Sequence, residues 1–241
     1  MKLLKPIALL VFLLSSTLSC AQWGNGKKMK GNGDITTATR STSSYEGVKA
    51  AGPMDFKLVE GKEGNISIKG DANLMEYIIT EVKNNKLVVK VKDGYNLKPS
   101  KTIVITVPYK SISSVSLAGS GDIENTGIIK TSNFKVALAG SGDINLDIES
   151  QSVESSIAGS GDIELKGSTK DLTTKIAGSG DFDGNALRST NVTVKISGSG
   201  NANVVCNGEL KVRISGSGDV KYSGKPTNKD TKVSGSGSVS N

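Results

Sequence analysis

Residues 139–144 read Ala-Gly-Ser-Gly-Asp-Ile, and variants of this motif recur throughout the second half of the chain. Each copy has a small residue, then Gly-Ser-Gly, then Asp or another polar residue, then an apolar residue. The seven copies begin their turns at Gly119, Gly140, Gly159, Gly178, Gly198, Gly216 and Gly235. The intervals between these glycines are 21, 19, 19, 20, 18 and 19 residues, and a period this constant is typical of stacked coils.

Apolar and polar residues alternate on both sides of each turn. Around Gly140, Val136 and Leu138 precede the turn and Ile144 and Leu146 follow it, and this period of two predicts a strand on each side. Because the alternation keeps its phase through the turn, we expect both glycines to point inward, where the missing Cβ lets two strands meet at a narrow corner. The serine and the aspartate then point outward. The turn glycines are Gly119, Gly121, Gly140, Gly142, Gly159, Gly161, Gly178, Gly180, Gly198, Gly200, Gly216, Gly218, Gly235 and Gly237.

One repeat therefore has the material for one flattened coil. It supplies two strands of roughly six residues and two corners, one Gly-Ser-Gly and one looser, such as Asn207-Gly208. Neighbouring coils pair in parallel at ~4.8 Å, and several are needed because no single coil buries its own apolar face. The sequence predicts an all-β solenoid of about seven Gly-Ser-Gly coils over residues 113–241.

Composition agrees with an all-β chain and excludes much of enzyme chemistry. Of 241 residues, 36% are apolar but only 4% are aromatic, and 29 are glycine, which suits short strands and tight turns. The chain has no histidine, so Ser-His-Asp or Cys-His catalysis, imidazole metal ligation and a histidine pH switch are excluded.

Residues 1–21 have the order of a secretory signal peptide: Lys2 and Lys5, an apolar run over 7–14, and then small residues. Two ways of processing stay open. Cleavage before Cys20 would attach lipid to that thiol and make a membrane-anchored lipoprotein, whereas cleavage after Ala21 would release a soluble exported protein. We expect export to the periplasm, the outer membrane or the cell surface.

The residues between the leader and the repeats fall into two parts. Residues 22–43 are rich in Gly, Ser, Thr and Lys and are predicted to be a flexible tether. Residues 44–112 lack the turn motif and are predicted to form a smaller N-terminal β domain that caps the solenoid. Within it, Asn84-Asn85 suits a hairpin turn and residues 73–77 suit a helical turn. The expected strands lie at 55–59, 65–69, 78–83, 86–92 and 102–107.

Residues 44–241 resemble a family of secreted bacterial proteins, the auto-transporter adhesins with a head GIN domain. The resemblance depends on residues 56–60 leading to 66–68, on Ile103-Val-Ile-Thr-Val-Pro108 before Val115-Ser-Leu-Ala-Gly-Ser-Gly-Asp122, and on the repeated turns. It implies a right-handed parallel β-helix, without the catalytic residues of pectate-lyase-like proteins. It also implies a role in cell adhesion.

The residue after each turn forms a mostly acidic column. Its aspartates are Asp122, Asp143, Asp162, Asp181 and Asp219, and Asn201 and Ser238 complete it. Outward carboxylates at one-coil spacing suggest calcium binding or a stripe that contacts a partner. Calcium-binding β-roll repeats, however, have a nine-residue period with a different aspartate position. We therefore expect these side chains to accept hydrogen bonds from turn amides, a role that Asp and Asn share.

Carboxylates on a β-helix also suggest a polysaccharide hydrolase or lyase. The column is uniform, however, and the ring side chains of Phe134, Phe182 and Tyr222 lie in the inward phase, so no sugar platform is expected. We predict no enzymatic activity, no catalytic or metal-binding residue and no cofactor. Cys206 is also in the inward phase and is predicted to be a buried, inert thiol.

The surface leaves several partners open. A small residue, Ala or Ser, precedes every turn, and such a flat stripe either packs tightly at the corner or docks another flat surface. Candidate partners are a surface glycan, an envelope protein or a second copy of the chain. Nucleic acid is not expected, because the lysines are scattered and the aromatics few. The predicted function is non-enzymatic adhesion, and the alternatives are a carbohydrate-binding or carbohydrate-active β-helix and a calcium-binding repeat.

Overall fold

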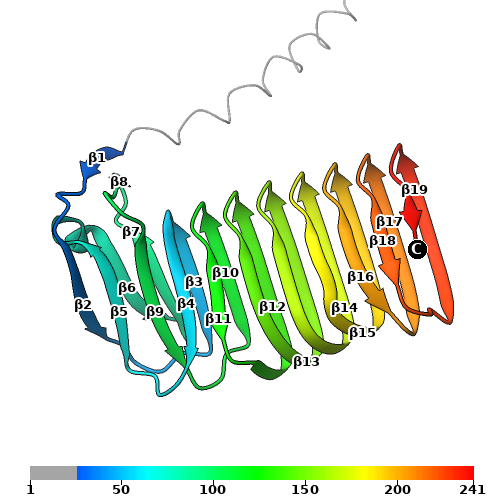
Figure 1. Cartoon of the computed structure of the whole chain (residues 1–241), viewed down its shortest axis with the longest axis horizontal. Coiled ribbons are helices and arrows are strands. Elements are labelled where there is room, and N and C mark those ends of the chain that lie inside the picture. The colour runs from blue at the N-terminus through cyan, green and yellow to red at the C-terminus, as the bar shows by residue number, and fades with distance from the viewer. Residues whose placement is uncertain (1–25) are drawn as a thin grey trace, which may run out of the picture.

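A computed structural model describes residues 26–241, which form a stack of parallel β-coils with antiparallel strands at its N-terminal end (Figure 1). The prediction of an all-β solenoid of about seven turns is confirmed. The strands within residues 113–241, where the Gly-Ser-Gly coils lie, are β10 (Ser114–Gly119), β11 (Ile123–Thr126), β12 (Ile129–Gly140), β13 (Ile144–Gly159), β14 (Ile163–Gly178), β15 (Phe182–Gly198), β16 (Ala202–Cys206), β17 (Glu209–Gly216), β18 (Val220–Ser223), β19 (Asn228–Gly235) and β20 (Val239–Ser240). Figure 1 shows the arrowheads of successive coils ending at one edge of the stack, where the glycine turns lie.

Equivalent residues of successive coils lie side by side. Strands β13 and β14 pair in parallel from Ile144 opposite Ile163 to Gly159 opposite Gly178. Apolar residues therefore stack on apolar residues inside the coils, and turn glycines stack on turn glycines. Phe134, Phe182 and Tyr222 are all buried, as their phase predicted.

The second corner differs from the expectation in the middle coils, whereas the expected break at Asn207-Gly208 is present between β16 and β17. We expected a break between two short strands, but β13, β14 and β15 run through this corner as single strands of 16 or 17 residues. The Ser150 hydroxyl donates to the carbonyl of Ser152 at 2.8 Å, and the Thr169 hydroxyl does the same to Asp171 at 3.2 Å. In β13 and β14 the corner is therefore a bend that a hydroxyl holds across two residues, rather than a break between strands.

The turn glycines are required for a different reason from the one expected. In every turn but the last, the second glycine is buried and the first is half-buried, but their missing side chains would point along the stack rather than into a narrow interior. A Cβ on Gly161 would overlap the carbonyl oxygen of Gly142 in the preceding coil. The first glycine also needs a positive φ, which is +137° at Gly140. Stacking between coils thus selects glycine.

The N-terminal part contains the expected strands and four more. The expected ones are β4 (Met54–Glu60), β5 (Asn65–Asp71), β6 (Ile78–Lys83), β7 (Lys86–Val91) and β9 (Ile103–Tyr109). The hairpin of β6 and β7 turns at Asn84-Asn85 with φ values of 51° and 58°, and a 3₁₀ helix covers Ala72–Tyr77, so both local predictions are confirmed. The additional strands are β1 (Lys27–Lys30), β2 (Ile35–Ser41), β3 (Gly47–Gly52) and β8 (Tyr95–Lys98).

The stack continues across the boundary that we predicted at residues 112 and 113. Strand β3 pairs in parallel with β10, and β4 with β11, so residues 47–60 form one more layer beneath the first Gly-Ser-Gly coil. Strands β7 and β9 pair with β3 and β4 in turn. The layers nearest the N-terminal end thus stack in an order that differs from their order in the chain, and a single apolar core runs through all of them.

Most of the predicted tether is ordered structure. Of residues 22–43, β1 pairs in parallel with β8, and β2 pairs antiparallel with β5 from Ile35 opposite Asp71 to Ser41 opposite Asn65. The polar composition of β2 reflects an outermost strand, whose residues are exposed or half-buried. The leader over residues 1–21 and Cys20 lie outside the described residues. No helix within residues 26–241 has the length and apolar character needed to cross a membrane.

The last coil differs from the coils before it. Lys229 occupies the inward position that Phe134, Leu172 and Leu210 fill in earlier coils. Its ammonium lies 3.1 Å from the Tyr222 hydroxyl and 5.5 Å from the ring centre. The stem of Lys229 thus lies over the apolar end of the core while its charge stays near solvent. A charged inward residue at the end of a sheet also opposes pairing with a further strand.

Candidate functional site

The acidic column is a ladder of hydrogen bonds between coils. Oδ1 of Asp122 accepts from the amide of Asp143 at 3.0 Å, and Oδ1 of Asp143 accepts from the amide of Asp162 at 3.0 Å. Asp162 accepts from the amide of Asp181 at 2.7 Å. Each carboxylate thus bonds the amide of the equivalent residue one coil further along, not an amide of its own turn.

The coils in which Asn201 or Ser238 replaces the aspartate keep the same hydrogen-bond geometry. Asp181 accepts from the amide of Asn201 at 2.7 Å, and the Asn201 side chain accepts from the amide of Asp219 at 2.9 Å. Asp219 accepts from the amide of Ser238 at 2.7 Å. Sequence reasoning missed the first member, Asp55, which accepts from the amide of Asp122 at 3.1 Å. The layer alignment of Gly52 with Gly119 identifies it, because Asp55 follows Gly52 as Asp122 follows Gly119.

This ladder gives the aspartates a structural use. Within residues 26–241, no three Cys, Asp or Glu side chains gather closely enough to hold a metal ion. The aspartates remain at the surface, since Asp122, Asp143, Asp162 and Asp219 are exposed and Asp181 is half-exposed. The column is therefore an accessible acidic edge whose oxygens are engaged in the stacking of coils.

Two broad faces flank the turn edge, and we name them by the strands that form them. The pre-turn face comprises the outward residues of the strands that end in Gly-Ser-Gly turns, and the post-turn face comprises those of the strands that follow the turns. On the pre-turn face, the third residue before the first glycine is basic in the last four coils. This basic column consists of Lys175, Lys195, Arg213 and Lys232.

Charges on the post-turn face have the opposite sign in the earlier coils. Glu124, Glu164 and Asp183 occupy one outward position there. Glu124 pairs with Lys57 at 2.9 Å, and Glu164 pairs with Lys166 at 3.0 Å. These pairs are exposed and contribute little stability, but they neutralise much of the acidic charge of this face.

A shallow groove of about 550 Å³ runs along the pre-turn face over the last five coils. The basic column forms part of its lining, and the small residues that precede the turns form its floor. These floor residues are all exposed: Ala158, Ala177, Ser197, Ser215 and Ser234. Sequence reasoning identified the stripe of small residues but not the basic column beside it. That column can be read from the sequence by aligning the repeats on their glycines.

Comparison with known proteins places the chain in a family. Residues 44–226 match the family described as "putative auto-transporter adhesin, head GIN domain". The chain belongs to this family. No curated protein matches the sequence.

Solved structures share the fold of this head GIN domain. A putative adhesin from Bacteroides fragilis has a TM-score of 0.82 at 21% identity, and the match covers 88% of this chain and 99% of that one. A putative lipid binding protein from Parabacteroides distasonis has a TM-score of 0.71 at 24% identity, covering 89% and 99%. A putative adhesin from Parabacteroides merdae has a TM-score of 0.70 at 22% identity, with the same coverage.

A buried carboxylate fastens the N-terminal end of this head GIN domain. Asp71 is fully buried and accepts hydrogen bonds from the Ser100 hydroxyl at 2.6 Å, the Ser100 amide at 2.8 Å and the Gly33 amide at 2.8 Å. The Ser100 hydroxyl and these amides hold the pKa of Asp71 below its usual range despite burial. Asp71 therefore ties together three segments of the cap, and it was not identified from the sequence.

Cys206 is a free thiol in the core of the head GIN domain, as its phase predicted. Burial raises the pKa of the Cys206 thiol, which keeps it protonated and a weak nucleophile. Its sulfur lies 3.4 Å from the carbonyl oxygen of Thr190. The thiol therefore packs as a small apolar side chain rather than forming a reactive centre.

Proposed function

We propose that this head GIN domain is a non-enzymatic adhesion protein of the cell envelope, which binds its partner through a lateral face of the solenoid. The observation that carries the proposal is the register between coils, which aligns equivalent outward side chains in columns. A repeated, flat and extended surface suits an extended or repetitive partner. Solenoids use such surfaces for binding.

Two features favour adhesion over catalysis. The chain lacks histidine, and its aspartate column repeats the same hydrogen bond in successive coils instead of forming one distinctive pair of carboxylates. A hydrolase or lyase needs an acid and a base in different environments, because their pKa values must differ. The uniform ladder offers equivalent positions, so it supports an architectural role.

The proposal includes export of the protein and its attachment to the membrane through a lipid on Cys20. If Cys20 is lipidated, Cys20→Ala moves the protein from the membrane fraction to the soluble fraction. A wild-type mature N-terminus at Gln22, determined by mass spectrometry, would reject the anchor and leave soluble export.

Adhesion is tested on whole cells and with purified protein. Protease treatment of intact cells is expected to degrade the protein, and beads coated with purified protein are expected to bind cells or host surfaces more than beads coated with a mutant that cannot fold. Gly161→Val provides such a mutant. Equal bead binding by folded and unfolded protein, or complete protection of the protein from external protease, would contradict the proposal.

A further inference from the structure

We propose that the groove beside the basic column binds a linear acidic glycan lying along the stack axis. This proposal rests on the proposed adhesive function and names the chemistry of its partner. The basic column, Lys175, Lys195, Arg213 and Lys232, places one cation on each of four successive coils. Neighbouring cations therefore recur at the strand spacing of ~4.8 Å.

The charge is concentrated in this half of the face. In the three coils before Lys175, the same position holds Ser116, Ala137 and Ser156. The Gly-Ser-Gly turns thus share one backbone, but only the last four of these coils present cations at this position. The N-terminal layer beneath the first coil has Lys49 there, separated from the basic column by these three uncharged coils. Coil stacking alone does not require this difference, since the position is exposed or half-exposed in every coil.

Much of the charge in the column has no carboxylate partner. Glu154 pairs with Lys175 at 2.8 Å, and Asp230 pairs with Arg213. Within residues 26–241, Lys195 and Lys232 form no ion pair, and both side chains are exposed. Exposed cations that are not neutralised attract polyanions most strongly at low ionic strength.

The floor of the groove suits sugar rings. Ala158 and Ala177 offer methyl groups, and Ser197, Ser215 and Ser234 offer hydroxyl groups. The apolar part of the lining is completed by Ile157, Ile176, Ile196 and Ile214. A pyranose ring lying flat can place its C–H groups on the methyls and its hydroxyls near the serines. Its carboxylate can then face the cation of the same coil.

Spacing favours a glycan over an extended acidic peptide. An extended peptide repeats side chains on one face every ~6.8 Å, whereas the cations recur every ~4.8 Å. Along a linear β-1,4-linked polyuronate successive sugars face alternate sides, so carboxylates on one side recur every second sugar. That repeat is close to the two-coil distance of ~9.6 Å between Lys195 and Lys232, the two unpaired cations. A second copy of this chain is a poorer partner, because Glu124 and Glu164 on its acidic face are already paired with lysines.

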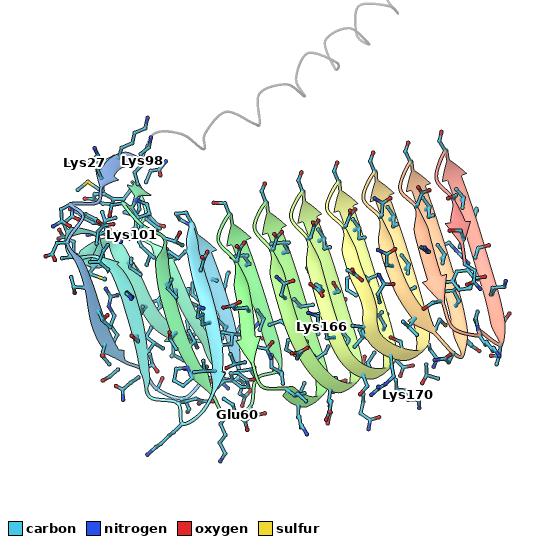
Figure 2. All side chains as sticks on the ribbon, in the orientation of Figure 1. Lys27, Glu60, Lys98, Lys101, Lys166 and Lys170 are labelled. Carbon is cyan, nitrogen blue, oxygen red and sulfur yellow. The ribbon has the colours of Figure 1, made fainter. Side chains whose placement is uncertain are left out.

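Binding of β-1,4-linked oligomannuronate to the purified full chain tests the proposal, with uncharged β-1,4-linked oligomannose of equal length as the neutral probe. The groove variant is Lys195→Ala/Lys232→Ala. The control variant, Lys170→Ala/Lys221→Ala, removes the same charge outside the groove. Figure 2 shows Lys170 at the edge opposite the glycine turns, and Lys221 lies on the post-turn face.

Calorimetry is expected to show that wild type and control bind the acidic oligomer equally, more weakly as salt rises, and that neither binds the neutral one. The groove variant should bind the acidic oligomer about tenfold more weakly, because it loses two exposed charge pairs between lysine and carboxylate. Unchanged thermal unfolding of both variants shows that they are folded. Equal affinity of groove and control variants, or equal binding of the neutral oligomer, would overturn the proposal.

Two further outcomes separate this inference from the adhesive function. If cells bind the protein but oligomannuronate neither binds it nor competes, adhesion stands and the acidic glycan is rejected. If ultracentrifugation shows salt-sensitive self-association that the groove variant abolishes, and no glycan binds, the groove holds a second copy and the glycan is again rejected.

Discussion

The amide of Asp181 donates a 2.7 Å hydrogen bond to Oδ1 of Asp162, one coil earlier in the stack. Asp162→Ala removes the acceptor and should lower the free energy of unfolding by about 0.5–1 kcal/mol. Asp162→Asn should have almost no effect, because Asn201 already serves as such an acceptor. Urea midpoints measure both. If Asp162→Asn lowered the free energy of unfolding as much as Asp162→Ala does, the charge of Asp162 and not its hydrogen bond would be the stabilising feature.

Gly161 should be among the least replaceable residues. A Cβ at this position overlaps the carbonyl oxygen of Gly142, so Gly161→Ala and Gly161→Val force neighbouring coils apart and should cost more than about 4 kcal/mol or prevent folding. Exposed Ser160 is the matched control, and Ser160→Ala should change stability by about 0.5 kcal/mol or less. Equal denaturant midpoints for substitutions at 160 and 161 would contradict the stacked-turn geometry.

Removing a buried hydroxyl should stabilise the protein. Ser155 and Thr174 lie side by side in adjacent coils, and both hydroxyls are buried without a hydrogen-bond partner among the described residues. Thr174→Val keeps the shape of the side chain and should raise the free energy of unfolding by about 1 kcal/mol. Thr173→Val, on the outward side of the same strand, is the control and should be neutral. Destabilisation by Thr174→Val would indicate that the hydroxyl has a partner in solution.

Asp71 should make the cap sensitive to acid. The pKa of Asp71 is lower in the folded protein than in the unfolded chain. Its contribution to the free energy of unfolding is therefore complete above the unfolded pKa of about 3.9 and is lost as pH falls through the lower folded pKa. Asp71→Asn places an amide donor among the Ser100 and Gly33 amides and should destabilise the protein at neutral pH. The difference from wild type should shrink below about pH 4 when urea midpoints are compared across pH. A constant difference at all pH values would assign the effect to packing alone.

Calcium should have little effect on stability, because the aspartate column already accepts backbone hydrogen bonds between coils. A ligand that binds only the folded state raises the melting temperature in proportion to the logarithm of its concentration. Scanning calorimetry with millimolar calcium and then with a chelator should give the same melting temperature. A calcium-dependent rise of several degrees would identify the column as a cation site.

The periodic part of the fold could be predicted because its determinants are local and repeated. A period of two around Gly140 defines the inward residues, and the spacing of the glycines defines the coil. Phe134, Phe182, Tyr222 and Cys206 are buried as this phase requires. The same register places Lys175, Lys195, Arg213 and Lys232 in one column, although the scattered lysines do not suggest it until the coils are aligned.

Within the Gly-Ser-Gly repeats, the sequence by itself thus determined the β structure, the coil period and which side chains face the core, since each depends on neighbours within one repeat. Only the tertiary structure decided how the N-terminal strands pair, because a sheet edge accepts any strand of matching register and burial. It placed β7 and β9 beneath β3 and β4, and it put the polar β2 against β5 instead of leaving a tether. It also decided that Asp162 bonds the next coil and that Asp71 joins Gly33 to Ser100, since these contacts connect backbone groups distant in the chain.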